Sequence, residues 1–175
     1  MTSLDSLRTE RLRLCRMTAA DFDDLFRMYR DERVMATLGG VISEEETRRR
    51  LGLHLAHWAE HGFGWWVLRD AATGHFVGRG GLRHYVLEGR PEVELGYGLR
   101  PEFWGKGLAT ELARESVRVG FTVLDVPELV GFTLTDNRGS RRVMEKAGFR
   151  YERDIIHADL PHVLYRLTAV EWQAL

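Results

Sequence analysis

Apolar and polar residues alternate along several segments of this chain, and the alternation predicts its strands. The two-residue period is clearest at 11–16 (RLRLCR) and at 93–99 (VELGYGL). Further strand-like segments, bounded by glycine and other turn residues, lie at 63–69, 75–85, 128–135, 149–157 and 162–168. The sequence therefore predicts a protein rich in β-structure.

A spacing of three and four residues between apolar positions predicts helices, and capping residues mark where two of them begin. Thr18 with Asp21 and Ser43 with Glu46 both have the spacing of a capping signal. Helical segments are expected at 22–29, 43–61, 108–121 and 137–147. The predicted order is β-α-α-β-β-β-α-β-α-β-β, which is an α+β fold with a mixed central β-sheet flanked by helices.

Glycine and turn residues predict three local irregularities. The segment 31–42 is expected to be short and irregular, with a turn at residues 39–40. The glycine pair at 80–81 indicates a β-bulge within the preceding strand. The last two strands are expected to meet in a turn about residues 159–161.

Length and composition limit the classes of function. With 175 residues the chain is expected to form one domain, 1–175, with a substantial core. The formal net charge is −1 and no basic patch stands out, so nucleic acid is not an expected partner. Cys15 is the one cysteine, which predicts no disulfide framework and no thiolate metal cluster. No apolar run approaches the ~20 residues needed to span a membrane, so we expect a soluble cytoplasmic protein without a membrane partner.

Residues 93–121 combine a strand, a glycine-bearing loop and a helix, and they carry the clearest indication of function. One face of the strand is apolar, whereas the other carries Glu94 and two glycines, which permit close approach of a ligand. The first N–H groups of the following helix have no intrahelical partner and lie at the positive end of its dipole. Gly105 and Gly107 would let a phosphate reach them, so the sequence predicts a phosphate or pyrophosphate site.

Three phosphate-binding motifs are compared with this loop. A P-loop fails, because Arg100 occupies the position of its first glycine and Gly107 that of Ser or Thr. A dinucleotide fingerprint is weak, because Thr110 replaces its third glycine. The third motif is [QR]-x-x-G-x-[GA], the acyl-CoA loop of the GNAT N-acetyltransferases, which Glu102, Gly105 and Gly107 match except at the first position.

Longer segments strengthen the third interpretation. The run ELGYGLRPEFWGKGLATE resembles the GNAT branch that includes the ribosomal-protein acetyltransferases RimJ and RimL. Near the C-terminus, TDNRGSRRVMEKAGFR is similar to the family signature T-x-N-x-x-S-x-x-x-x-E-K-x-G-F. With the opening TERLRLCRMTAADF and the closing LTAVEW, the resemblance covers nearly the whole chain. It implies the GNAT fold and acetyl transfer from acetyl-CoA to an amine.

The resemblance also implies roles for individual residues. Backbone N–H groups would bind the pyrophosphate of coenzyme A at Gly105, Lys106, Gly107, Leu108 and Ala109. Tyr97 and Leu99 would contact the cofactor along the strand, which would offer a backbone N–H to the thioester oxygen. Asn137 would bind the pantetheine arm, and as a helix N-cap it also has a simpler explanation.

Two side chains are candidates for acid–base chemistry. Glu94 would take a proton from the amine, directly or through water, although a strand carboxylate is also often simply paired or solvated. Met144 stands where many family members have a tyrosine that protonates the leaving thiolate. The resemblance therefore makes Ser140 the candidate for that role, with an ordinary serine of the first helical turn as the alternative.

Histidines and tryptophans between 54 and 66 invite other interpretations. His54, His57 and His61 share one helical face, but no cysteine and no HExxH pattern accompanies them, so no metal site is predicted. A solvated face or the lining of a substrate cleft is expected instead. The core is expected to contain three tryptophans, Trp58, Trp65 and Trp66, with the lining of a substrate pocket as the alternative.

These observations predict an acetyl-CoA-dependent N-acetyltransferase acting on a primary amine. The resemblance to RimJ and RimL implies a protein N-terminal α-amine as acceptor, whereas other enzymes of the branch act on small amines and antibiotics. Two further classes stay open. One is a CoA-binding sensor without catalysis, and the other is a dinucleotide-binding oxidoreductase, which lacks support from a doubly wound array of strands. A homodimer is also left open.

Overall fold

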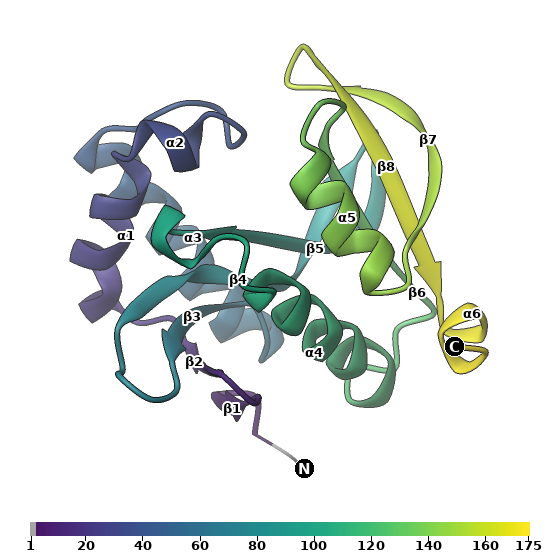
Figure 1. Cartoon of the computed structure of the whole chain (residues 1–175), viewed down its shortest axis with the longest axis horizontal. Coiled ribbons are helices and arrows are strands. Elements are labelled where there is room, and N and C mark those ends of the chain that lie inside the picture. Colours follow the sequence, from purple (N-terminus) through teal and green to yellow (C-terminus); the bar gives the residue numbers. More distant parts are fainter. Residues whose placement is uncertain (1–2) are drawn as a thin grey trace. The chain divides into compact units, whose positions relative to one another are not determined.

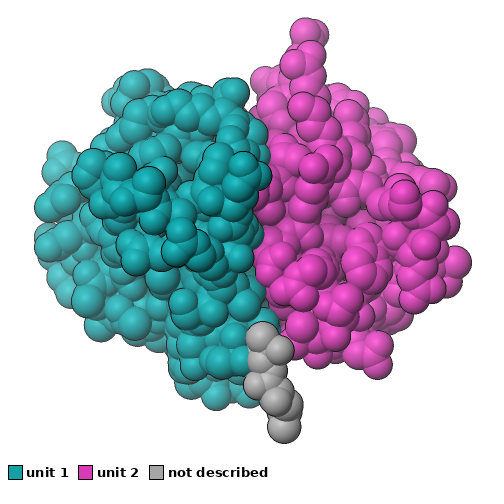
Figure 2. Space-filling model, turned by 60° about the horizontal axis from the view of Figure 1, so that its bottom comes forward, with its two compact units in different colours: residues 1–81, 97–109 teal, residues 82–96, 110–175 magenta. Residues whose placement is uncertain are grey.

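The computed structural model describes residues 3–175 (Figure 1). The chain folds as two compact units, which Figure 2 colours separately. Unit 1 comprises Met1–Gly81 with Tyr97–Ala109, and unit 2 comprises Leu82–Gly96 with Thr110–Leu175. That residues 1–175 form a single domain stays a prediction. Within residues 3–175, no helix has both the length and the apolar character needed to cross a membrane.

Helices and strands alternate along the chain much as the sequence predicts. The helices are α1 Phe22–Tyr29, α2 Glu32–Met35, α3 Glu44–His61, α4 Leu108–Thr122, α5 Arg138–Lys146 and α6 Ala169–Gln173, with 3₁₀ turns η1 Ala19–Asp21 and η2 Pro101–Phe103. The strands are β1 Ser6–Arg8, β2 Leu12–Arg16, β3 Trp65–Asp70, β4 Phe76–Leu87, β5 Arg90–Leu99, β6 Glu128–Leu134, β7 Arg150–His157 and β8 Leu160–Thr168.

The strands form a sheet with the order β1-β2-β3-β4-β5-β6-β8-β7. β5 and β6 run parallel, with Glu94 opposite Val130. The pairs β1–β2, β2–β3, β3–β4, β6–β8 and β7–β8 are antiparallel. A parallel pair needs a crossover connection, and α4 lies in the connection between β5 and β6. The prediction of an α+β fold with a mixed sheet is therefore confirmed.

Unit 1 buries an apolar core between its helices and strands. Its members are Met17, Leu25, Met28, Tyr29, Val34, Met35, Leu51, Trp65, Val67 and Phe76. Both predicted helix starts form: the Thr18 N–H donates to the Asp21 carboxylate at 2.8 Å, and Ser43 Oγ accepts from the Glu46 N–H at 3.1 Å. α3 ends at Gly62, whose φ of 71° favours glycine. The three tryptophans expected in the core are buried.

Unit 2 contains the β7–β8 hairpin and β6, and Figure 1 shows α5 beside them. Its apolar cluster consists of Leu87, Val130, Ile155 and Leu164, with Tyr85 and Phe132 packed against them. Gly131 on β6 faces α5, because a Cβ built there would lie 2.7 Å from the Met144 sulfur. Glycine at this position therefore allows Met144 to pack closely on the strand. Val130 and Phe132 point to the opposite face, since neighbouring strand residues alternate.

Three short elements lie outside the predicted pattern. β1 has 3 residues, α2 has 4 and α6 has 5. Segments this short do not show the two-residue period of a strand or the 3.6-residue period of a helix. α2 begins after Asp31, whose side chain accepts from the Arg33 N–H. α6 begins at a capping box formed by Thr168 and Glu171. Local capping, rather than periodicity, therefore determines both short helices.

The predicted final turn and the predicted β-bulge at residues 80–81 lie elsewhere. The last hairpin turns at Ala158 and Asp159, with φ of 49° and 60°, and β8 already includes Pro161. Two positive φ angles are typical of the type I′ turn, whose twist matches that of the strands it joins. In the β3–β4 pairing the register shifts next to Leu68, opposite Val77, and residues 80–81 pair regularly with β3.

Candidate active site

The glycine-bearing loop between η2 and α4 is exposed at Gly105 and Gly107. Their φ angles of 71° and 79° belong to the left-handed region that favours glycine. A Cβ built at Gly105 would meet no atom within 4 Å, so the space above this residue is open. Trp104 anchors the loop, because its Nε1 donates to the Leu99 carbonyl at 2.8 Å. The loop therefore presents its backbone to solvent where α4 begins.

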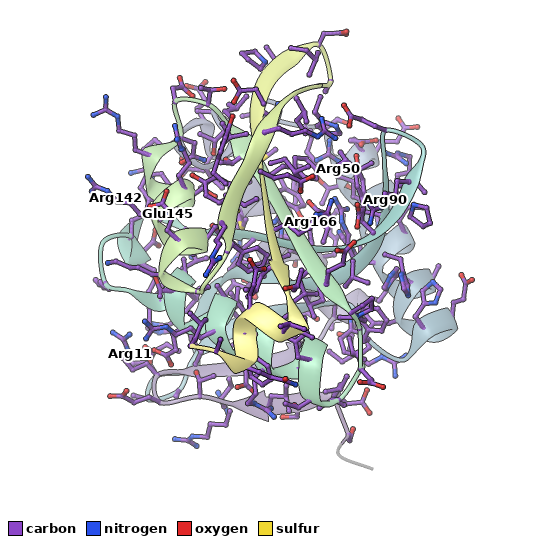
Figure 3. All side chains as sticks on the ribbon, turned by 90° about the vertical axis from the view of Figure 1, so that its right-hand side faces the viewer. Arg11, Arg50, Arg90, Arg142, Glu145 and Arg166 are labelled. Carbon is purple, nitrogen blue, oxygen red and sulfur yellow. The ribbon has the colours of Figure 1, made fainter. Side chains whose placement is uncertain are left out.

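Arg11, which precedes β2 and is labelled in Figure 3, lies against this loop. Its Nη1 donates to the Lys106 carbonyl at 2.7 Å, and its Nη2 would lie 3.5 Å from a Cβ built at Gly107. The Lys106 ammonium lies 5.6 Å from the centroid of the Phe103 ring. Two cationic side chains thus border the loop, and the positive end of the α4 dipole adds to them. This arrangement favours an anionic ligand.

Glu94 on β5 is buried, with 5% of its surface exposed. Arg83 of β4 donates from Nε to Glu94 Oε2 at 2.6 Å. Glu94 is therefore a paired carboxylate, as one of its two interpretations from the sequence expects. Further along β5, in unit 1, Tyr97 is half-buried and Leu99 is buried.

A tyrosine–histidine cluster, formed by Tyr85, Phe132, His157 and His162, brings four elements of unit 2 together. Tyr85 Oη lies 3.4 Å from His157 Nε2, and the two imidazole centroids are 5.3 Å apart. The Phe132 ring packs against His157 and His162, at centroid distances of 4.8 and 6.0 Å. Arg83 lies over the Tyr85 ring, 4.8 Å from its centroid. The cluster therefore adjoins the Arg83–carboxylate pair.

Burial sets the protonation states in this cluster. It lowers the pKa of His157 below the ordinary 6.5, and a charge on His162 would lower that pKa further. Burial raises the pKa of Tyr85 above 10.0, and the negative charge of Glu94 adds to this effect. Near pH 7 His157 is therefore neutral and Tyr85 protonated. In the tautomer of the neutral ring that carries its proton on Nδ1, His157 Nε2 accepts from the Tyr85 hydroxyl.

Asn137 and Ser140 form the start of α5. Asn137 Oδ1 accepts from the Ser140 N–H at 3.1 Å, and its Nδ2 donates to Thr133 Oγ1 at 3.0 Å. Asn137 is thus the N-cap, as the simpler interpretation expects, and each end of its amide keeps capacity for one further hydrogen bond. Met144 is 1% exposed and packs its sulfur on β6. This position therefore serves packing and supplies no hydroxyl.

The three histidines of α3 take part in local contacts. His54 is buried and stacks on Trp65 with 4.8 Å between centroids, so a solvated face is wrong for this residue. His57 Nδ1 lies 2.8 Å from the Phe63 carbonyl oxygen, and the His57 and His61 centroids are 4.5 Å apart. In the described part of the chain, no three His, Cys, Asp or Glu side chains are grouped to hold a metal ion.

A family model described as the acetyltransferase (GNAT) domain matches residues 11–150. The match runs from the beginning of β2 to the beginning of β7 and includes the glycine-bearing loop, Glu94 and Ser140. The chain belongs to the GNAT family. It is therefore an acetyltransferase of GNAT type, and enzymes of this type use acetyl-CoA as their acetyl donor.

Individual relatives and solved structures agree with this assignment. The protein YkkB of Bacillus subtilis (strain 168) is 29% identical over 166 residues, covering 94% of this chain and 96% of YkkB. The FsC-acetyl coenzyme A-N(2)-transacetylase of Aspergillus fumigatus is 36% identical over 125 residues, covering 63% of this chain and 52% of the transacetylase. A solved acetyltransferase from Agrobacterium tumefaciens str. C58 is 29% identical, with a TM-score of 0.83 over 95% of this chain and 96% of its own.

The loop of this GNAT chain fits the phosphates of acetyl-CoA. The open space at Gly105, the left-handed Gly107 and the neighbouring Arg11 guanidinium together form a cradle for an anion beside a helix N-terminus. Arg11 is missing from the residues that the sequence predicts, because 95 positions separate it from Lys106. The sequence also does not predict the residues near Glu94, because only the folded sheet brings them together: Arg83, Tyr85, His157 and His162.

Proposed function

We propose that this GNAT acetyltransferase transfers the acetyl group of acetyl-CoA to a primary amine of low basicity, with a protein N-terminal α-amine as the leading acceptor. The observation that carries the proposal is the open, cation-bordered glycine-bearing loop at the start of α4. The resemblance to the RimJ and RimL branch supports the choice of a protein N-terminus. A small-molecule amine is the second candidate, because the branch that the chain resembles also includes enzymes acting on small amines.

Binding of the donor is assigned to the residues that the family resemblance names, together with Arg11. Backbone N–H groups of Gly105, Lys106, Gly107, Leu108 and Ala109 hold the pyrophosphate, and Arg11 adds charge. Tyr97 and Leu99 on β5 contact the donor, and Asn137 uses its remaining amide capacity on the pantetheine arm. When bound, acetyl-CoA supplies the acetyl thioester that the amine attacks.

The transfer needs one proton acceptor and one aid to the leaving group. As the amine nitrogen bonds to the acetyl carbon and the carbon–sulfur bond breaks, the nitrogen loses a proton and the sulfur leaves as thiolate. Glu94 is the carboxylate proposed to take that proton, and the neutral His157, joined to Tyr85, is a second acceptor beside it. Ser140 is proposed to donate to the departing sulfur, since Met144 has no hydroxyl.

The energetics of amine ionisation favour an α-amine over a lysine side chain. Only the neutral amine attacks, and neutralising an α-amine with a pKa of about 7.7–8.0 costs roughly 1–1.4 kcal/mol at pH 7. A lysine side chain, with a pKa of about 10.4, costs roughly 4.6 kcal/mol. The base proposed for this step is a single carboxylate, Glu94, which pairs with Arg83, so the acceptor that costs less to neutralise is favoured.

Competition between two peptides at pH 7 tests the acceptor. One peptide has a free N-terminus and no lysine, and its counterpart has a blocked N-terminus and one lysine; mass spectrometry follows the added acetyl groups. We expect acetylation of the free N-terminus to be the faster. Faster acetylation of the lysine peptide would refute the α-amine acceptor. If no amine of a wider panel is acetylated while calorimetry still detects acetyl-CoA binding, the chain is a CoA-binding sensor. A cytoplasmic location and a homodimer stay predictions.

A further inference from the structure

Arg79 on β4, in unit 1, is a buried cation with no ion pair in the described part of the chain. Only 4% of its surface is exposed, and its Nη1 has no hydrogen-bond partner among residues 3–175. Its Nε donates to the Tyr29 hydroxyl at 3.2 Å, and its guanidinium lies 4.2 Å from the centroid of the Trp65 ring. Arg69 of the same unit differs, because it pairs with two carboxylates at 2.9 and 3.2 Å.

A buried charge of this kind is costly to the folded state. Removing a guanidinium from water loses its hydration, and aromatic contacts and one neutral hydrogen bond replace only part of it. An anion at the unpartnered Nη1 would supply the missing interaction. A role of Arg79 in binding a ligand, rather than in stabilising the fold, would therefore explain why the protein buries this charge.

Strand backbone and apolar side chains surround the Arg79 guanidinium. A Cβ built at Gly98 on β5 would lie 3.5 Å from the Arg79 guanidinium carbon, so the absence of a side chain there leaves the cation bordered by strand backbone. The same Cβ would lie 3.0 Å from the end of Leu38, a partly buried side chain between α2 and α3. The same Cβ would also lie 3.0 Å from the Met28 methyl carbon, so the side chains of Leu38 and Met28 both border Gly98 beside the guanidinium. Leu38 precedes two glycines with positive φ.

We propose that Arg79, with the Tyr29 hydroxyl beside it, binds a carboxylate carried by the acceptor amine. The inference rests on the proposed function, because it names the chemical class of that acceptor. The phosphates of the donor already have a cradle at the glycine-bearing loop, so the unused cation is assigned to the other substrate. Tyr29 accepts from Arg79, and its own O–H is a second donor for a carboxylate oxygen. Polyamines, whose groups are all cationic, are disfavoured at this site.

Matched acceptors test the assignment. Dipeptides that begin with Asp or with Asn, and Ala-Ala with a free or an amidated C-terminus, differ within each pair only by one carboxylate. We expect wild type to prefer the acid member of at least one pair by about 10- to 100-fold in kcat/KM, the range of a hydrogen bond to a charged group. In Arg79→Gln the preference should collapse to within about twofold, with acetyl-CoA affinity unchanged.

Thermal unfolding separates binding from a structural role. Removing an unpartnered buried charge should leave the Tm of Arg79→Gln equal to or above that of wild type. Arg16→Gln, which removes an exposed guanidinium of the same unit, is the matched control and should keep the acid preference. An acid preference absent from wild type or retained in Arg79→Gln would overturn the proposal, as would a lower Tm with unchanged selectivity.

Calorimetry makes the test independent of turnover. The N-acetylated forms of the same peptides are titrated into the protein in the presence of CoA. Tighter binding of the acid member to wild type, lost in Arg79→Gln, would support the carboxylate site even if no amine in the panel were acetylated. Equal binding of acid and amide members to wild type would overturn the site, whereas failure of acetylation alone would contradict only the proposed function.

Discussion

At the scale of single residues, the identity of the proton acceptor can be decided by pH dependence. Burial, followed by the charge of His162, lowers the pKa of His157 below 6.5. If neutral His157 accepts the proton, kcat should fall as the pH drops through this lowered pKa, because the protonated ring can accept nothing. His157→Gln should lose this acidic limb, with a rate about 10²- to 10⁴-fold lower. A pH profile of kcat between 5 and 9 measures both effects.

Glu94→Gln and Tyr85→Phe complete this comparison. The charge of Glu94 acts to raise the pKa of His157, so Glu94→Gln should move the acidic limb to lower pH. Tyr85→Phe removes the hydroxyl that lies 3.4 Å from the imidazole and keeps the ring in place. A large loss of rate in Glu94→Gln, together with full activity in His157→Gln, would assign the proton to the carboxylate instead.

At the scale of elements, the start of α4 is where loop conformation and ligand binding meet. Gly107 has a φ of 79° and lies next to Arg11, so any side chain here is strained by about 1–2 kcal/mol and intrudes on the anion cradle. Gly107→Glu also places a negative charge where the pyrophosphate is proposed to bind. We expect it to abolish acetyl-CoA binding, measured by calorimetry on the folded variant.

Gly107→Gln separates charge from shape, because it has the same size and the same backbone strain. It should weaken acetyl-CoA binding less than Gly107→Glu does, and the difference between the two should shrink in high salt as the charge is screened. Unchanged acetyl-CoA affinity in a folded Gly107→Glu protein would show that the phosphates bind elsewhere.

Elements governed by local signals could be predicted from the sequence, and contacts between distant segments could not. α3 begins at Ser43 and ends at Gly62 as predicted, because a cap and a left-handed glycine act within a few residues. The glycine-bearing loop is a local motif as well. By contrast, Tyr85 and His157 are 72 residues apart and no pattern along the chain connects them. Glu94 could be predicted as a candidate from its position on the strand. Its cationic partner, Arg83, could not be predicted, because the pairing depends on how the strands are arranged in the sheet.

At the scale of the whole molecule, one arginine connects four strands of unit 2. Arg166 of β8 donates to Glu92 of β5 at 3.0 and 3.2 Å, to Glu128 of β6 at 2.8 Å and to Glu152 of β7 at 2.7 Å. Arg90, which Figure 3 labels together with Arg166, also reaches Glu92 and Glu128. The network fixes β5 two residues before Glu94, so it supports both stability and the candidate site.

Replacing Arg166 should therefore cost much more stability than replacing an exposed arginine. In Arg166→Met the Glu92 side chain, which is 5% exposed, loses both hydrogen bonds from Arg166 and keeps its pair with the exposed Arg90. A buried charge left wholly uncompensated costs about 3–5 kcal/mol, which is the upper limit here because Arg90 stays paired with Glu92, and this limit corresponds to a loss of Tm of roughly 6–20 °C for a chain of this length. Arg153→Met is the matched control, since its pair with Glu88 is solvent-exposed and contributes little. If the cost arises from the stranded carboxylate, adding Glu92→Gln to Arg166→Met should recover part of the lost Tm. Equal Tm values for Arg166→Met and Arg153→Met would mean that the sheet does not depend on this network.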